Sequence, residues 1–193
     1  MGNPILHGEV GTTSRPRTRW PLAWPLTLVS GAAVVAIGAR IAVPLPFSPV
    51  PLTMQDLAVL LVGGLFGSAI GAGALLLYLI AGAFGLPVFA PVGAPGLARL
   101  SGPTGGYLLA FPLAAAVVGA VGQRGHLVRC LVAALLGMVI IHFGGWAQLA
   151  IQTDDPAGAL ALGLVPFLFT GLLKVLLTGV VLWWVHHGLR LRS

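Results

Sequence analysis

Long apolar segments separated by short polar stretches make up the chain from residue 20 onward. The segments that carry at most one aspartate, glutamate, lysine or arginine are residues 20–39, 57–98, 100–123, 130–153 and 156–189. A helix needs about 20 apolar residues to cross the hydrocarbon core of a bilayer. The pattern therefore predicts an all-α integral membrane protein built from transmembrane helices.

The segment 57–98 decides how many helices there are. Its end, 85–98, is rich in glycine and proline and is predicted to be a loop, so the helical part is either one long helix or two short ones. With two, the total is six. One side then carries Arg15, Arg17, Arg19, Arg124, Arg129, Arg190 and Arg192, and the other carries only Arg40 and Arg99. Because basic residues concentrate on the cytoplasmic side, we expect six transmembrane helices with both termini cytoplasmic.

The same reasoning divides the chain. We expect a cytoplasmic tail over 1–20, a six-helix membrane domain over 21–189 and a second cytoplasmic tail over 190–193. The apolar run after the first arginines is too long for a signal peptide, so it is predicted to be an uncleaved helix. Irregular backbone at membrane depth occurs only inside protein or beside a cavity. The proline- and glycine-rich loops 43–54 and 85–102 therefore suggest a lid over an outward-facing pocket.

Composition narrows the classes of function. The chain is 58% hydrophobic and 7% charged, with a mean hydropathy of +1.01, whereas a soluble domain is about 25% charged. The formal charge of +6 comes from bases outside the apolar segments, which argues against nucleic-acid binding. One cysteine excludes an internal disulfide, and His142 is too isolated for a zinc site. No phosphate-binding loop is present, so we expect no cofactor, no metal and no ATPase of its own.

Lys174 is the most informative residue. A lysine near the bilayer centre costs about 2.5–3.5 kcal/mol on insertion scales and normally faces a cavity or a partner. The alternative is a lysine that snorkels to the interface from a shifted last helix. On the first interpretation, Lys174 is a buried cation that binds an anionic ligand such as a carboxylate. Pro166 and Gly171 precede it, so a kink is expected to help shape the site.

Other polar candidates lie near the predicted outer face. The sequence SGPTGGY at 101–107 combines cap residues, a proline at the predicted first helical position and two glycines, which together start a helix. The exposed amides of such a terminus suit polar or anionic ligand groups. Candidate residues here are Thr104, Gly105 and Tyr107. We expect Gln55 to add hydrogen bonds and Trp146 to add stacking.

Small residues four apart recur on the first three helices. Ala32 and Ala36 form one pair, and Gly63, Gly67 and Gly71 form a longer series. Such faces allow helices to pack closely in lipid. Internal packing and docking on another subunit both remain open, the second especially for the first helix.

Four segments together resemble the BioY family, the biotin-specific substrate-binding (S) components of energy-coupling factor (ECF) transporters. They are ARIAVPLPFSPVPLTMQDLAVLLVGGLFG (39–67), LYLIAGAFGLPVFA (77–90), LARLSGPTGGYLLAFPLAA (97–115) and LVPFLFTGLLKVLL (164–177). The resemblance implies a six-helix S-component fold in the cell membrane, biotin binding from outside, and docking on a transmembrane coupling subunit that works with two ATPases. It also implies that Ala32 and Ala36 form the docking face.

The resemblance also bears on the biotin site. The family usually places an acid three residues before the lysine, but Gly171 stands there in this chain. Since Gly171 supplies no anion, we expect Lys174 to pair with the carboxylate of biotin, and Arg99 is the second candidate for that role.

Three other functions are weighed against this one. An S component for thiamin or riboflavin would need several aromatic stacking residues, yet aromatic content is only 8%. An integral-membrane transferase would need clustered acids or a catalytic histidine, and the four acids are scattered. A self-sufficient secondary transporter would need more ionisable residues within the membrane.

Overall fold

Helices account for most of the computed structural model, which describes residues 23–123 and 126–190. Arg15, Arg17, Arg19, Arg124 and Arg192, which entered the topology argument, lie outside the described residues. The long helices are α1 (Ala23–Arg40), α2 (Gln55–Phe66), α3 (Ser68–Ala83), α5 (Gly105–Gly122), α6 (Leu127–Thr153) and α8 (Leu168–Arg190). Every predicted apolar segment thus contains at least one helix, and the prediction of a mainly helical chain is confirmed.

The segment 57–98 holds two helices, as the charge distribution predicts. Gly67 separates α2 from α3 and has a φ of 87°, a conformation that side chains other than glycine rarely adopt. The Gly67 amide donates a hydrogen bond to the carbonyl of Gly63 and closes α2, and Ser68 opens α3. A single left-handed glycine therefore turns the chain between two short apolar helices.

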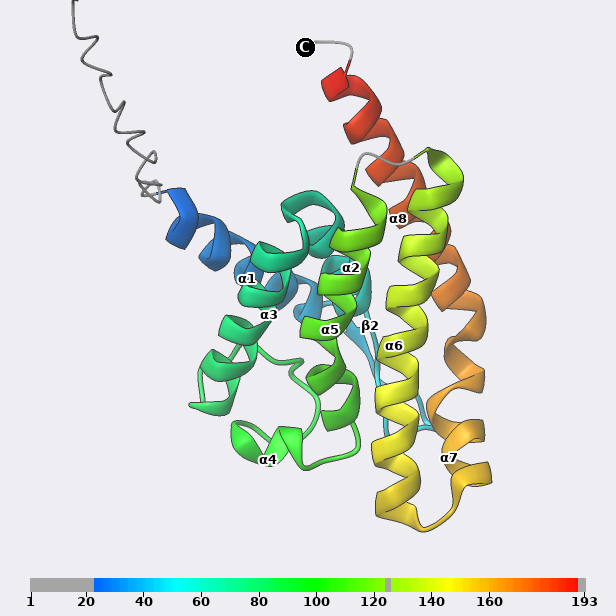
Figure 1. The fold of residues 1–193 in the computed structure, drawn as a ribbon. Helices are drawn as coiled ribbons and strands as arrows, with labels where there is room; N and C mark the ends of the chain where they lie inside the picture. The colour runs from blue at the N-terminus through cyan, green and yellow to red at the C-terminus, as the bar shows by residue number, and fades with distance from the viewer. Residues whose placement is uncertain (1–22, 124–125, 191–193) are drawn as a thin grey trace, which may run out of the picture.

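Three of the connections lie at the end of the bundle opposite the C-terminal end of α8 (Figure 1). Residues 41–54 form a hairpin with strands β1 (Ala42–Val43) and β2 (Leu52–Thr53). Residues 84–104 form a long loop that contains the short helix α4 (Leu97–Leu100), and α7 (Pro156–Gly163) follows α6. The four prolines of 43–54 exclude a helix there, which explains why the chain crosses this region as a hairpin.

The last apolar segment is interrupted near Pro166. The short 3₁₀ helix η1 (Val165–Phe167) lies between α7 and α8, so the predicted kink is observed as a break. The start of α5 differs from the prediction, because the helix begins at Gly105 and Pro103 lies in the turn before it. A turn that precedes the helix satisfies the Gly105 amide through the carbonyl of Gly102, at 3.0 Å.

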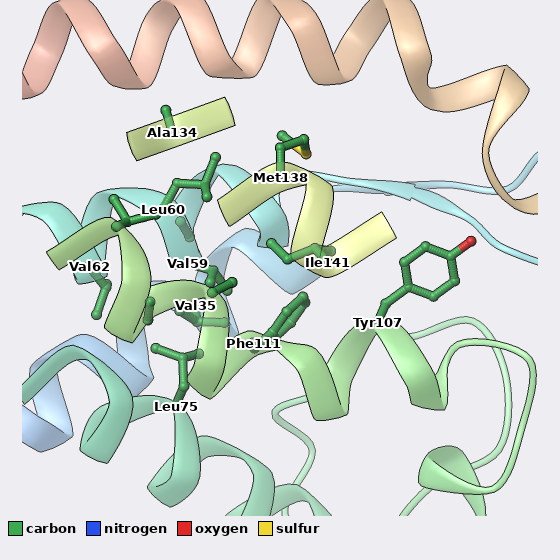
Figure 2. Packing of buried hydrophobic residues seen from close by; sticks show 14 of the residues in the cluster. Val35, Val59, Leu60, Val62, Leu75, Tyr107, Phe111, Ala134, Met138 and Ile141 are labelled. Atoms are coloured by element: carbon green, nitrogen blue, oxygen red, sulfur yellow. The ribbon is translucent and has the colours of Figure 1, made fainter. Parts of the chain in front are cut away.

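Three segments of the described chain are long and apolar enough to cross a membrane: Gly105–Gly122, Leu127–Thr153 and Pro156–Gly188. The apolar helices within Trp24–Arg40, Gln55–Phe66 and Ser68–Ala83 are shorter. In Figure 1, α5, α6 and α8 lie side by side, with α1 and α3 on the other side of α5. The core is at the centre of this bundle, where Leu60, Leu75, Phe111 and Ile141 come together from α2, α3, α5 and α6 (Figure 2).

Close approach between α2 and α5 depends on Gly63. A Cβ atom placed there would lie within 3.0 Å of backbone atoms of Ala115, so the two helices would have to separate. Gly71 faces Gly63 in the same way, with its Cβ position 2.9 Å from the Gly63 Cα. The small-residue spacing on these helices therefore serves internal packing.

Gly63→Ala is expected to destabilise the protein by about 1–3 kcal/mol, because the added methyl group meets backbone that cannot rotate away. In thermal unfolding of the detergent-solubilised protein, we expect Tm to fall by several degrees. Gly188→Ala is the matched control, since no atom lies within 4 Å of its added methyl group and alanine favours the helix. A Tm for Gly63→Ala equal to or above that of the control would contradict this packing.

Candidate functional site

A cavity opens between the helices and the connections gathered at one end of the bundle. The empty space within its walls and open mouth together is about 590 Å³. The hairpin, the loop 84–104, α2, α5, α6, η1 and α8 all contribute to its wall. Its polar side chains are Thr53, Gln55, Asp56, Arg99, Thr104, Tyr107, His142 and Lys174. A site with so many convergent polar groups inside an apolar bundle is the default candidate for ligand binding.

Lys174 lies in this cavity and is buried, with 6% of its surface exposed. Its ammonium nitrogen Nζ lies 2.7 and 2.8 Å from the two carboxylate oxygens of Asp56 on α2, and 2.6 Å from the carbonyl oxygen of Thr53. A lysine has three donors and no acceptor, so all three are used. The snorkelling alternative is excluded by this geometry.

The expectation that Lys174 lacks an anionic partner on the protein is therefore wrong. Gly171 supplies no anion, but Asp56 does so from another helix. A ligand carboxylate could bind Lys174 only by displacing Asp56 or Thr53. The physical reason is that a buried ammonium is costly without an anion, and in this structure Asp56 provides that anion.

Arg99 is the second buried cation of the cavity, with 5% of its surface exposed. Its guanidinium donates hydrogen bonds to the carbonyl oxygens of Ala90 and Val92, both in the loop 84–104. Its Nε atom is buried without a hydrogen-bond partner, and Arg99 forms no ion pair with a carboxylate among residues 23–123 and 126–190. Burial lowers the pKa of the Arg99 guanidinium from its ordinary value, because the protein solvates the charge less well than water. An anion bound here would offset that loss of solvation.

Gln55 and Tyr107 line the cavity as predicted and are held by the protein. The Gln55 side-chain amide donates to the hydroxyl oxygen of Tyr78, which in turn donates to the carbonyl of Val88 at 3.2 Å. The Tyr107 hydroxyl donates to the carbonyl of Gly163 at 2.5 Å, and Figure 2 shows this hydroxyl pointing away from the core. These bonds hold the side chains of Gln55 and Tyr107 in place in the cavity wall.

Two predicted residues do not line the cavity. The Gly105 amide is already bonded to Gly102, although its neighbour Thr104 is part of the cavity wall. Trp146 donates from its indole nitrogen to the carbonyl of Pro156, at 3.1 Å, and lines a separate apolar groove between α6 and α8. The ligand contacts expected of Gly105 and Trp146 therefore stay predictions, which the lining of this cavity does not support.

Ala32 and Ala36 are half-buried and pack against the core. The exposed face of α1 carries other residues, including Leu26, Ser30, Ala33 and Ile37. Internal packing, one of the two alternatives for Ala32 and Ala36, is thus observed.

Sequence reasoning missed Asp56 and His142 as cavity residues. Asp56 has a usable signal, because it is an acidic residue at the start of an apolar segment, and Lys174 is an equally isolated base. His142 has no such signal, since one histidine in an apolar helix is uninformative without its neighbours. Within the described part of the chain, no three His, Cys, Asp or Glu side chains are grouped so that they could hold a metal ion.

Comparisons with known proteins identify the family to which the chain belongs. A sequence model of the BioY family matches residues 17–190. The chain belongs to the BioY family. It is 40% identical over 142 residues to the probable biotin transporter BioY of Pyrococcus horikoshii, covering 74% of this chain and 83% of the relative. It is 35% identical to the biotin transporter BioY of Thermotoga maritima, covering 77% and 87% of the two chains.

A solved structure shares the fold of this BioY family member. It is the S-component for biotin from an ECF-type ABC transporter, which matches with a TM-score of 0.77 at 24% identity. The match covers 88% of this chain and 94% of the other. The S-component fold that the sequence resemblance implied is thereby confirmed.

Proposed function

We propose that this protein is the biotin-binding membrane subunit of a biotin uptake system that works with an ECF coupling module. Membership of the BioY family and relatives named as biotin transporters support this function. The buried polar cavity supports it independently, because a small polar ligand needs such a site within an apolar bundle. The protein itself is not an enzyme in this proposal. ATP is hydrolysed by the partner subunits.

One observation carries the assignment of the ligand carboxylate. Arg99 is a buried cation in the cavity wall with an unpartnered Nε and no acid paired to it among the described residues. An arginine offers planar donors that suit a carboxylate. We therefore assign the biotin carboxylate to Arg99, with Lys174 and Asp56 kept together as a pair on the wall of the site.

Coupling to the partner subunits is proposed to use α1. Its outer face is apolar and includes the small residues Ser30 and Ala33, which would allow a partner helix to approach closely. Ala32 and Ala36, which are half-buried in this structure, stay part of the proposed docking face.

The proposed topology has six spans in the cell membrane and both termini in the cytoplasm. The gathering of the hairpin, the loop 84–104 and α7 at one end supports it. We expect cysteines at Ser48 and Asp155, introduced after Cys130→Ala, to react with an impermeant thiol reagent added outside intact cells. A cysteine at the exposed His126 should react only after permeabilisation. The reverse pattern would overturn the topology.

Equilibrium binding to the purified protein in detergent tests the function itself. We expect saturable biotin binding that excess desthiobiotin reduces and excess thiamin leaves unchanged. Competition by thiamin would favour an S component for another vitamin. No saturable biotin binding by folded protein would contradict the proposed function.

A further inference from the structure

His142 is a polar side chain of the cavity wall that neither the family resemblance nor the assignments above use. It lies on α6 with 8% of its surface exposed. Its ring is fixed by aromatic neighbours, with Tyr107 edge-on at 6.1 Å and Phe167 tilted at 6.2 Å between ring centroids. A buried ring held on two sides presents its nitrogens in a defined direction.

The hydrogen bonds of the ring determine what each nitrogen can do. Nδ1 lies 3.0 Å from the carbonyl oxygen of Met138, and a carbonyl only accepts, so Nδ1 carries a hydrogen. The neutral ring then presents Nε2 as an acceptor. No donor from residues 23–123 or 126–190 bonds to Nε2. Asp56 is already paired with Lys174, so no free carboxylate is present in the cavity wall to favour a charged ring.

The surroundings of the ring indicate where a donor would come from. His142 lies in the wall between the polar cavity and the groove beside α6 and α8. All other side chains that line the groove are apolar except the indole of Trp146, whose N–H is bonded to Pro156. The cavity is therefore the side from which a hydrogen-bond donor can reach Nε2.

We propose that Nε2 of His142 accepts a hydrogen bond from a ring N–H of the ligand and makes the site selective for cyclic ureas. This inference rests on the proposed function. A cyclic urea such as that of biotin carries two N–H donors, and the cavity offers two matching acceptors. One is Nε2, and the other is the Asp56 carboxylate, which keeps lone pairs for a ligand after bonding Lys174.

Two substitutions of His142 by residues of similar size distinguish the role of Nδ1 from that of Nε2. The amide of His142→Asn can replace Nδ1 and its bond to Met138, but nothing replaces Nε2. The longer side chain of His142→Gln can place its oxygen near the position of Nε2. Loss of an acceptor that faces a buried donor leaves that donor without a hydrogen bond and weakens binding. We therefore expect His142→Asn to weaken biotin binding about tenfold and His142→Gln to weaken it less than about threefold.

A change in the ligand tests the same bond from the other side. In each of two carbamate analogues of biotin, one ring N–H is replaced by oxygen with little change of shape. The wild type should bind both of them more weakly than biotin, by about tenfold, because each lacks one of the two N–H donors. His142→Asn should lose the discrimination against the carbamate that lacks the N–H facing Nε2 and keep it against the other, and His142→Gln should keep both. A merely structural role would weaken biotin and both carbamates equally in His142→Asn.

The inference is overturned if His142→Asn binds biotin as the wild type does, or keeps full discrimination against both carbamates. If His142→Asn does not fold, the wild type decides alone, and equal affinity for biotin and both carbamates overturns the inference. In either case, biotin binding by the wild type leaves the proposed function intact. Absence of biotin binding to the folded wild type would instead overturn the proposed function, and the inference with it.

Discussion

Replacing Arg99 with glutamine is expected to weaken biotin binding by about two to three orders of magnitude. Removing one partner of a buried, hydrogen-bonded charge pair costs about 2–5 kcal/mol, and each 1.4 kcal/mol is about tenfold in affinity. The unpaired Nε of Arg99 and its lack of a carboxylate partner in the described chain make it the cation that gains most from the ligand. Titration calorimetry of the purified protein measures the change.

Biotin amide provides the control for this prediction. Arg99 also holds the carbonyl oxygens of Ala90 and Val92, so its loss could loosen the loop 84–104 and weaken any ligand. A loosened loop would weaken biotin and its neutral amide equally. Loss of a charge contact would weaken biotin far more than the amide, and this is the result we expect. Equal losses would remove Arg99 from the carboxylate assignment.

Asp56→Ala is expected to destabilise the folded protein by about 3–5 kcal/mol, because it leaves the buried Lys174 ammonium without its anion. The pair is almost closed to solvent, with side-chain exposures of 7% for Lys174 and 16% for Asp56. The ion pair also joins α2 to α8, and its two residues are 118 positions apart in the sequence. Thermal unfolding in detergent should show Tm falling by about 10 °C, since 1 kcal/mol corresponds to about 2–4 °C for a chain of this size.

The double variant Asp56→Ala/Lys174→Met is the control for Asp56→Ala. Replacing both members of a buried pair with apolar residues is often neutral, so we expect most of the lost stability to return. A double variant as unstable as Asp56→Ala alone would show that Asp56 stabilises the fold through contacts other than Lys174.

The helices could be predicted from the sequence because apolar length and charge placement act locally. Proline at 43–54 excluded a helix there through its backbone conformation, and the placement of basic residues predicted two helices in the second long segment. The position of their division, Gly67, was not predicted. The first residue of α5 was harder to predict from the sequence. Cap residues at 101–104 fit several turn geometries, and only the packing of the loop 84–104 selects the one that begins the helix at Gly105.

Part of the cavity lining could be predicted from the sequence, but the pairings of its side chains could not. Five of the predicted residues line the cavity: Lys174, Arg99, Gln55, Thr104 and Tyr107. A polar side chain within an apolar bundle is costly unless it faces a cavity or a partner. The partner of Lys174 is Asp56, on a different helix and far away in sequence. Helix spacing relates a residue only to neighbours three or four positions away. Sequence reasoning therefore considered position 171, where the family usually has an acid, and did not consider Asp56 on α2 as the partner of Lys174.

Determination of a biotin-bound structure tests the central claim most directly. The account predicts biotin inside the cavity, with its carboxylate oxygens at hydrogen-bond distance from the Arg99 guanidinium and Lys174 still paired with Asp56. Biotin with its carboxylate on Lys174 and the Asp56 pair broken, or biotin bound outside this cavity, would contradict it.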